Sequence, residues 1–388
     1  IKNRQGKKQD TTKRQRKMRR PTLAKLILLP LSKIYGVVTA VRNLCYNCNI
    51  IKSYSFDVPV VCIGNLAVGG TGKTPHTEYV VAALRDRFNI GILSRGYKRH
   101  TSGFVAATPQ STPNDIGDEP YQIYHKFGRK ITVCVCEDRV AGIRRMLADD
   151  PSLSMIVLDD AFQHRRVKPD ISIVLTEYNR PYFKDRMLPY GRLRESAKNI
   201  TRADIVIVTK CPNSIRPIDI RTFGKNLNLI PDQGLFYSRY AYEQTRPVFG
   251  GTPIRLDRLT TNDAVLVIAG IANPKPFVRY VKSFDAHVKV NIFDDHHNYT
   301  RHDLELITER YNSLQGARKV IVTTEKDAVR LLNNPYFPKA LKNALMYVPV
   351  HVEFLHTEPG DTLRGETLRD EILRLMKLKG LLNPLRHT

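Results

Sequence analysis

The sequence predicts an α/β protein built on a doubly wound parallel sheet, with a second, smaller α/β lobe and a helix ahead of both. Apolar runs of strand length alternate with helical patterns through most of the chain, which is typical of βαβ units. A glycine-rich turn follows the first of these runs and leads directly into a helical segment. The length of 388 residues exceeds that of one ordinary domain, so we expect two lobes.

The alternation sets the order of the predicted elements. In the first lobe we expect strands at 58–64, 89–94, 130–136, 155–159, 171–176 and 204–209, with helices at 74–87, 117–127 and 138–148. In the smaller lobe we expect strands at 264–270, 287–293, 319–323 and 345–350, with helices at 274–284, 301–313 and 327–332. The predicted boundaries are 1–18 for a basic tail, 19–50 for the N-terminal helix, 51–211 for the first lobe, 212–262 for a hinge rich in Pro, Asn and Arg, 263–355 for the smaller lobe and 356–388 for a C-terminal helix.

The chain is strongly basic, with a formal net charge of +25. Ten Lys and Arg lie within residues 1–20, where Asp10 is the one acid. Met18 directly precedes Arg19 and the first apolar run, so we expect it to be the natural start and residues 1–17 to be either disordered or not native. A basic surface attracts nucleic acid, phospholipid or a phosphorylated substrate. No helix-turn-helix, zinc module or stacking-aromatic pattern is present, so we expect no specific nucleic-acid binding.

One segment, Leu23–Cys45, is apolar enough to involve a membrane. Lys25, Lys33 and Arg42 interrupt it and Pro30 breaks it, so no uninterrupted run approaches the roughly 20 apolar residues of a spanning helix. A segment of this kind can lie in the interface of an anionic leaflet. It can equally pack on the protein core, and the residues alone leave both interpretations open.

The six cysteines indicate a reducing compartment. They lie in or beside apolar segments, and Cys45 and Cys48 form the one CxxC spacing. A single CxxC supplies half of a zinc site, and no second pair or histidine cluster follows it at ligand spacing. We therefore expect packing cysteines in a cytoplasmic protein.

The glycine-rich turn predicts a phosphate-binding loop, and with it a P-loop NTPase-like sheet. Backbone N–H groups of such a loop cradle a β-phosphate, Lys73 reaches the β and γ oxygens, and the Thr74 hydroxyl ligates Mg²⁺. Ala67 stands where the usual motif has glycine. The expected nucleotide-binding residues are Gly69, Gly70, Thr71, Gly72, Lys73 and Thr74.

Two acids follow a later strand. Ile156, Val157 and Leu158 lead into Asp159 and Asp160, the position at which a phosphate-loop fold holds the acid beside Mg²⁺. Two acids can also simply end a strand. With a phosphate loop upstream, the sequence favours the magnesium interpretation but does not say which acid lies nearer the metal.

Three further polar loops are candidates for the same edge of the sheet, where ligands of α/β proteins bind. Gly117–Pro120 opens a helix, where acids are also favoured by the helix dipole. Asp294–His297 follows a strand and is either an exposed polar loop or, less often, a metal cluster. Leu188–Glu195 carries two arginines that either form surface ion pairs or neutralise phosphate.

The motifs, taken in order, resemble one known family. GNLAVGGTGKTP, LSRGYKR, GDEP, DDAFQHRR, LPYGRLRE, FDDHH and TTEKDAVRL resemble the tetraacyldisaccharide 4'-kinases of lipid A synthesis. The resemblance covers about residues 19–350, and LLPLSKIYG resembles the membrane-associating segment of that family.

The resemblance implies transfer of the ATP γ-phosphate to the 4'-hydroxyl of a tetraacylated disaccharide 1-phosphate, with Mg²⁺. It implies a peripheral enzyme at the cytoplasmic face of the bacterial inner membrane, whose partners are the acylated lipid and the anionic membrane surface, with no obligate protein partner. Residue by residue, it implies catalysis by Asp118, His296 and Lys73, metal binding by Thr74, Asp159 and Asp160, and substrate or phosphate contacts by Arg95, Tyr97, Arg194 and Glu195. His297 adjoins the implied histidine, so the assignment can shift by one residue.

The alternative function is a membrane-associated P-loop GTPase or ATPase switch. A GTPase needs an NKxD sequence to read guanine. Thr209–Pro212 has the right strand position but ends in proline where aspartate is required, and Glu325–Asp327 lacks the intervening residue. The sequence therefore disfavours this alternative.

Overall fold

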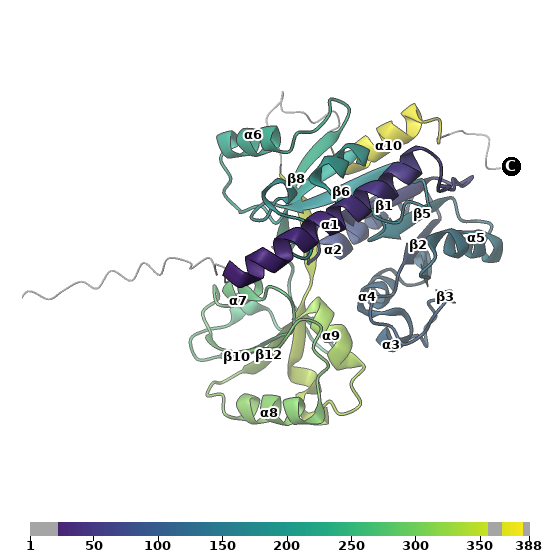
Figure 1. Cartoon of the computed structure of the whole chain (residues 1–388). Coiled ribbons are helices and arrows are strands. Elements are labelled where there is room, and N and C mark those ends of the chain that lie inside the picture. Colours follow the sequence, from purple (N-terminus) through teal and green to yellow (C-terminus); the bar gives the residue numbers. More distant parts are fainter. Residues whose placement is uncertain (1–21, 356–366, 383–388) are drawn as a thin grey trace, which may run out of the picture.

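The computed structural model describes residues 22–355 and 367–382, and the basic tail predicted at 1–18 lies outside them. Within the described chain the strands form two sheets, of nine and five strands. Figure 1 shows them as two lobes, the larger above the smaller. Both sheets are mainly parallel, so the predicted α/β class is confirmed.

The larger lobe is built on the nine-stranded sheet. Its strands are β1 (Val60–Asn65), β2 (Ile90–Ser94), β3 (Val105–Ala106), β4 (Thr132–Val135), β5 (Met155–Asp159), β6 (Ile171–Glu177), β7 (Ile205–Thr209), β8 (Gly234–Tyr242) and β14 (Val350–Phe354). Their order in space is β14-β8-β7-β6-β1-β5-β2-β4-β3. The run from β8 to β4 is parallel, and β14 and β3 add antiparallel edges.

The helices of this lobe come from both ends of the chain. They are α1 (Thr22–Asn47), α2 (Lys73–Leu84), α3 (Pro113–Ile116), α4 (Asp118–Phe127), α5 (Arg139–Asp149), α6 (Pro217–Asn226) and α10 (Leu368–Leu378). The last of them falls within the predicted C-terminal segment.

Helices cover both faces of the larger sheet, so alternate side chains of one strand enter different cores. Val61 and Ile63 of β1 share a core with Val80 of α2, whereas Cys62 shares one with Ile143 of α5. A strand covered on both faces must be apolar at every position. This is why β1, β5 and β7 are continuous apolar runs and are buried along their whole length.

The smaller lobe repeats this plan on a smaller scale. Its strands are β9 (Arg246–Pro247), β10 (Ala264–Ala269), β11 (His287–Ile292), β12 (Lys319–Thr324) and β13 (Leu345–Val348), in the order β11-β10-β12-β13-β9. Its helices are α7 (Lys275–Val281), α8 (Arg301–Asn312) and α9 (Glu325–Leu332). The ends of β10 and β11 and the start of α9 therefore meet at one edge of the sheet.

The chain crosses between the lobes twice. It leaves the larger sheet along β8 and enters the smaller sheet as β9, and it returns by passing from β13 into β14. Because β8 pairs with β14 and β9 pairs with β13, the two crossings are hydrogen-bonded to each other on both sides. The stretch 212–262, in which the sequence analysis placed no strand, thus contains α6, β8 and β9.

The lobes also touch through α4 and α9. Val329 of α9 packs with Ile116, Tyr121 and Val135 of the larger lobe. The Asn333 amide, at the end of α9, donates a hydrogen bond of 3.0 Å to the Tyr121 hydroxyl. The first turn of each of these two helices carries acidic residues.

The cysteines behave as packing residues for the most part. Cys62, Cys134, Cys136 and Cys211 are buried free thiols, and burial raises the pKa of the Cys62 thiol to about 12. Within residues 22–355 and 367–382, no group of three or more His, Cys, Asp or Glu side chains could hold a metal ion by itself.

Candidate active site

The glycine-rich turn forms a loop between the end of β1 and the start of α2. Gly69 and Gly72 have positive φ of 116° and 97°, conformations that favour glycine. At Gly72 a Cβ would also collide with the Tyr240 hydroxyl. Ala67 needs no such freedom, because it lies in an extended bridge to Leu193. The departure from the usual motif therefore falls at a position where this chain has no need of glycine.

The loop is held from the strands beneath it. The Asn65 amide donates to the Thr71 hydroxyl (2.7 Å), and the Thr209 hydroxyl at the end of β7 donates to the Thr71 carbonyl (2.8 Å). The Lys210 ammonium donates to the Gly70 carbonyl. A loop whose carbonyls are bound from below keeps its conformation fixed before any anion arrives.

Asp159 ends β5 and Asp160 follows it, beside this loop. Lys73 Nζ lies 3.5 Å from Asp160 Oδ2, and the Thr77 hydroxyl donates to Asp159 Oδ1 (3.1 Å). Arg194 binds Asp160 with both ends of its guanidinium, at 2.9 and 3.3 Å. We call Lys73, Thr74, Asp159, Asp160 and Arg194 the phosphate-loop cluster; all of it lies in the larger lobe.

The two acids of this cluster differ in electrostatics. Burial, followed by the charge of Asp160, raises the pKa of Asp159 to about 6. Burial also raises the pKa of Asp160, but Lys73 and Arg194 outweigh it and hold that pKa below its ordinary value. Burial and a neighbouring carboxylate both disfavour the ionised form of a carboxyl group. A bound cation relieves this repulsion, so such a pair is well suited to bind one.

The residues present fit Mg²⁺ and a nucleotide phosphate. Mg²⁺ prefers hard oxygen ligands and keeps several positions for phosphate and water, so the Thr74 hydroxyl with Asp159 and Asp160 is a suitable protein donor set. Lys73 supplies the matching positive charge for phosphate oxygens. The open space around Gly70, where a Cβ would meet nothing within 4 Å, leaves room against the loop.

A second cluster joins the two lobes. Asp118 opens α4, His296 lies in the loop after β11, and Arg330 lies on α9. His296 Nδ1 lies 3.1 Å from Asp118 Oδ2, and Arg330 Nε and Nη2 donate to the same oxygen at 3.0 and 2.7 Å. We call these three residues the interlobe cluster.

Asp118 is held ionised in this cluster. Its burial raises the pKa, but the hydrogen bond from His296 and the charge of Arg330 outweigh burial and lower the pKa of Asp118 to about 2. The carboxylate also sits in the first turn of α4, where the helix dipole favours negative charge. The preceding Gly117 has φ 90°, and a Cβ there would meet the Tyr97 carbonyl at 3.0 Å.

The two adjacent histidines have different partners. His297 Nε2 contacts Asp303 Oδ2 at 3.0 Å, and its ring stacks on Phe293. His296 is therefore the histidine that meets Asp118. It adopts φ 59°, and its backbone N–H donates to the Gly270 carbonyl at 3.2 Å.

The two clusters are neighbours. Glu119, next to Asp118, is close enough for its charge to raise the pKa of Asp159. Lys326 of the smaller lobe binds Glu119 at 2.7 Å. Acids from α4 and from the end of β5 thus face one region at the carboxyl edge of the larger sheet, the position where α/β sheets bind ligands.

The four expected substrate contacts lie in different surroundings. Arg95 and Tyr97 are exposed after β2, and the Tyr97 ring meets the His296 ring at 5.8 Å between centroids. Arg194 is bound to Asp160. Glu195 is buried, and Asn43, Gln163, Asn199 and Arg202 donate to its carboxylate at 2.6–3.2 Å. The structure thus places Tyr97 beside the interlobe cluster. The Glu195 carboxylate is instead occupied by hydrogen bonds from other side chains of the protein.

The sequence analysis did not single out Arg330 or Lys326. Both lie in the quoted TTEKDAVRL motif, yet nothing local marks a basic residue on a helix as a site residue. Arg330 is 212 residues from Asp118 in the chain, and its side chain is only 6% exposed. A buried, charged arginine needs an acidic partner. The one signal in the sequence was the position of Arg330 in the apolar pattern of the helix.

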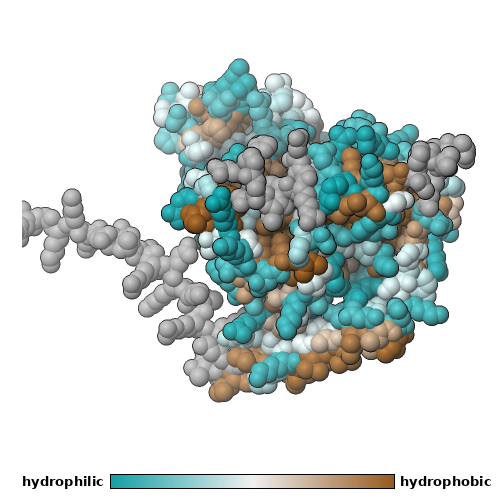
Figure 2. All heavy atoms as spheres, turned by 90° about the horizontal axis from the view of Figure 1, so that it is seen from above, coloured by the Kyte–Doolittle hydropathy of each residue, from teal (hydrophilic) through white to brown (hydrophobic). Residues whose placement is uncertain are grey.

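The N-terminal helix α1 docks on the larger lobe by a polar stripe. Ser32 donates to the Met187 carbonyl, Tyr35 to the Arg194 carbonyl and Asn43 to Glu195, at 2.9, 2.9 and 3.2 Å. The exposed side is apolar and comprises Leu26, Ile27, Leu29, Leu31, Ile34, Val37, Val38, Val41 and Leu44. Figure 2 shows hydrophobic atoms in a band along the lower edge of the molecule, on the side that α1 occupies. The segment Leu26–Asn47 is long and apolar enough to cross a membrane by length and composition alone.

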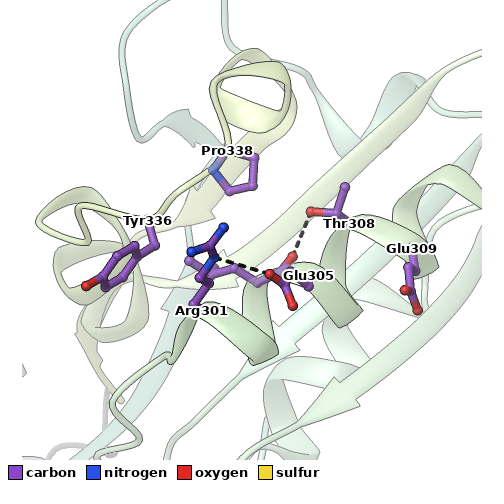
Figure 3. Close-up of a pocket in the computed structure, with 7 residues that line it drawn as sticks. Arg301, Glu305, Thr308, Glu309, Tyr336 and Pro338 are labelled. Carbon is purple, nitrogen blue, oxygen red and sulfur yellow. Dashed lines mark hydrogen bonds and ion pairs between the residues drawn. The ribbon is translucent and has the colours of Figure 1, made fainter.

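A surface groove lies away from both clusters. It is lined by Arg301, Glu305 and Thr308 of α8 with Tyr336 and Pro338 of the following segment (Figure 3). Arg301 pairs with Glu305, one turn along the same helix, at 3.3 Å. None of the candidate site residues lines this groove.

Known proteins are similar to this chain over most of its length. Residues 24–366 match the family described as tetraacyldisaccharide-1-P 4'-kinase. The tetraacyldisaccharide 4'-kinase of Bacteroides thetaiotaomicron is 47% identical over 340 residues, covering 85% of this chain and 89% of the relative. That of Porphyromonas gingivalis is 44% identical, with 84% and 92% covered.

A solved structure shares the fold as well. LpxK from Aquifex aeolicus, solved in complex with ATP, superposes with a TM-score of 0.68 at 26% identity, covering 89% of this chain and 98% of that one. With the family matched across most of its length, and relatives this similar over more than four fifths of it, the chain belongs to the tetraacyldisaccharide-1-P 4'-kinase family.

Proposed function

We propose that this protein transfers the γ-phosphate of ATP to the 4'-hydroxyl of a tetraacyldisaccharide 1-phosphate in lipid A synthesis. The observation that carries the proposal is the interlobe cluster: an ionised carboxylate beside a phosphate-loop cluster, with a histidine holding one of its oxygens. The hydroxyl oxygen forms a bond to the γ-phosphorus, the bond from that phosphorus to the β-γ bridging oxygen breaks, and ADP leaves. The hydroxyl proton passes to Asp118.

The depressed pKa of Asp118 suits this role. In a loose phosphoryl-transfer transition state the attacking hydroxyl loses its proton late, so the acceptor need not be a strong base. Position matters more than basicity, and His296 fixes the position of the carboxylate from the other lobe. Since the charge to be spread lies on the phosphoryl oxygens, Lys73 supplies most of the stabilisation that the chain itself provides.

The phosphate-loop cluster holds the nucleotide in this proposal. Gly69 to Thr74 bind the phosphates through backbone N–H groups and the Lys73 ammonium. Thr74, Asp159 and Asp160 would hold Mg²⁺, which would neutralise negative charge on the nucleotide phosphates. Arg194, already paired with Asp160, adds a guanidinium beside the transferred group.

We further propose that the protein lies on the cytoplasmic face of the inner membrane through α1. The helix presents its apolar side outward and keeps its polar stripe on the protein, which is the orientation of an interfacial helix. A helix bound to the larger lobe from Ser32 to Asn47 rests in the lipid interface rather than crossing it. An acylated acceptor stays in the bilayer, so this placement brings the site to it.

The test is transfer of ³²P from [γ-³²P]ATP with Mg²⁺ to purified tetraacyldisaccharide 1-phosphate in detergent micelles, with Lys73→Ala and Asp118→Ala beside the parent. We expect labelled lipid from the parent and almost none from either variant. ATP or GTP hydrolysis without labelled lipid would contradict the acceptor assignment and favour a nucleotide switch. A variant lacking residues 1–48 that still sediments with anionic liposomes would contradict the role of α1.

A further inference from the structure

Arg330 is the one member of the interlobe cluster with no assigned role. It lies on α9 of the smaller lobe, and its guanidinium reaches Asp118 at the start of α4 in the larger lobe. Nε and Nη2 donate to the carboxylate at 3.0 and 2.7 Å, and Nη2 lies 3.1 Å from His296 Nδ1. The arginine thus touches both members of the proposed catalytic pair.

The contacts fall unevenly on the carboxylate. Arg330 Nε, Arg330 Nη2 and His296 Nδ1 all meet Asp118 Oδ2. Oδ1 has no hydrogen-bond partner among residues 22–355 and 367–382. One oxygen of the carboxylate therefore has its acceptor capacity filled by the protein, and the other keeps its lone pairs for a further donor.

The side chain that does this is itself fixed. Arg330 Nη1 donates to Asp327 Oδ1 at 3.0 Å and to the Gly270 carbonyl at 3.2 Å. Asp327 is fully buried and also accepts the Gly270 N–H at 2.9 Å. The same Gly270 carbonyl accepts the His296 N–H. Arg330 and His296 are thus set on one backbone anchor at the end of β10, so they approach Asp118 as a unit.

We propose that Arg330 is a positioning residue: by saturating Oδ2 together with His296, it leaves Oδ1 as the oxygen that accepts the proton of the attacking hydroxyl. This inference rests on the proposed phosphoryl transfer and on Asp118 as its proton acceptor. Arg330 acts through Asp118 and contacts neither substrate. It also makes the acceptor site depend on the apposition of the two lobes, since Arg330 and Asp118 belong to different lobes.

The charges around Asp118 predict a pH signature. Glu119 with its partner Lys326, Asp295 near His296, and Asp327 behind Arg330 are the other charged groups facing the cluster. Burial alone raises the pKa of Asp118, and His296 and Arg330 reverse that effect. Without the arginine the carboxyl would take up a proton at higher pH, so activity would fall on the acid side at a higher pH than in the parent.

The experiment is ³²P transfer to tetraacyldisaccharide 1-phosphate across pH 4.5–9, with ATP binding and thermal unfolding measured on the same proteins. The variants are Arg330→Gln, Arg330→Lys and, as the matched control, Lys326→Gln. Lys326 also joins the lobes from α9 but binds Glu119 instead of Asp118. Arg330→Gln is repeated in the Asp118→Ala background.

We expect Arg330→Gln to lower kcat by roughly ten- to a hundredfold, the effect of misplacing a reacting group by about 1 Å, with KM for ATP unchanged and the acid limb moved upward. Arg330→Lys keeps the charge, so it should recover part of kcat and most of the parental acid limb. It also replaces Arg330→Gln as the test variant if the glutamine variant fails to fold. Lys326→Gln should keep kcat within about threefold of the parent. In the Asp118→Ala background, Arg330→Gln should cost nothing more.

Three results would overturn the inference. The first is a kcat and pH profile in Arg330→Gln that equal those of the parent. The second is a loss of kcat in Lys326→Gln as large as in Arg330→Gln. The third is a loss of kcat on adding Arg330→Gln to Asp118→Ala that is as large as in the parent. Each of these requires an active parent that Asp118→Ala inactivates. A parent that labels no lipid would instead contradict the proposed function itself, so the two failures are distinguishable.

Discussion

The phosphate-loop cluster and the interlobe cluster are built in different ways. The first comes entirely from the larger lobe, where β1 and β5 end at one edge and set Lys73 beside Asp160. The second takes Asp118 from the larger lobe and takes His296 and Arg330 from the smaller one. The first is complete within one lobe, whereas the second exists only while α4 and α9 are in contact.

The difference predicts that nucleotide binding and phosphoryl transfer are separable in this fold. A change in the larger lobe can alter ATP binding without moving the smaller lobe. A change at the contact between lobes should leave ATP binding intact and remove the proton acceptor from its place. The following predictions test that separation, beginning with the largest expected effect.

Asp118→Asn should abolish most transfer while sparing ATP binding. Asparagine keeps the shape but loses the charge that Arg330 and His296 bind and the lone pair that takes the proton. Removing a general base costs typically 10²–10⁴-fold, so we expect a fall of that order in kcat. Calorimetric titration of ATP·Mg²⁺ should give parental affinity for Asp118→Asn and much weaker binding for Lys73→Ala. Equal loss of binding in both variants would break the separation.

Asp159→Asn should raise the Mg²⁺ requirement and leave the acceptor side untouched. Asp159 is a proposed metal ligand, and even outer-shell partners of metal ligands are worth about 10- to 100-fold in affinity. We expect the Mg²⁺ concentration for half-maximal transfer to rise by about a hundredfold, with KM for the lipid unchanged. Thr77→Val removes only the hydrogen bond to Asp159 and should give a smaller shift. A parental Mg²⁺ dependence in Asp159→Asn would exclude it as a ligand.

Glu195→Ala should destabilise the larger lobe. It leaves Arg202 unpaired and releases Asn43 of α1, and breaking a buried ion pair by removing one partner costs about 3–5 kcal/mol. We expect Tm to fall by several degrees, with KM for ATP rising because Gln163, bound to Glu195, also binds the end of β1. Glu305→Ala, which breaks the exposed pair with Arg301, should change stability by under about 1 kcal/mol. An unchanged Tm in Glu195→Ala would contradict its anchoring role.

Glu325→Gln should change the pH dependence of stability slightly. Burial, then the charge of Glu78, raises the pKa of Glu325 from 4.5 to about 7. A carboxyl with a raised folded pKa binds its proton more tightly in the native state, so stability is lost as pH rises from about 4.5 to about 7. Glutamine removes this loss, and we expect it to raise the free energy of unfolding at pH 8 and to raise it less at pH 5. The exposed Glu309→Gln should show no such difference, and thermal unfolding at both pH values measures it.

The same contrast explains how much of the molecule could be predicted from sequence. The phosphate loop and Asp159–Asp160 are local signals, because each motif lies at the junction of one apolar strand and the next element. Most strands were predicted for the same reason. The stretch 212–262 was not resolved into α6 and β8, since proline and asparagine at its ends outweigh the strand-forming residues within it.

The interlobe cluster could be predicted only in part from the sequence. The family resemblance implied Asp118 and His296, but their contact joins residues 178 positions apart, and no sequence period encodes such a contact. Arg330 was missed because a basic residue on an amphipathic helix ordinarily faces water. Glu195 shows the opposite case: a charged residue in a candidate motif that the fold turns inward against four donors.

The double crossing between the lobes has a consequence for synthesis. Tyr242 and Val350 are register partners, so the whole smaller lobe is an insertion between two adjacent positions of one sheet. The ribosome therefore delivers the complete smaller lobe before the larger lobe receives β14 and then α10, whose Leu368, Ile372 and Met376 complete a core shared with β1. Until those residues emerge, β8 is an open edge, and open edges favour aggregation. The larger lobe is thus completed only by roughly the last tenth of the chain, from β14 onward.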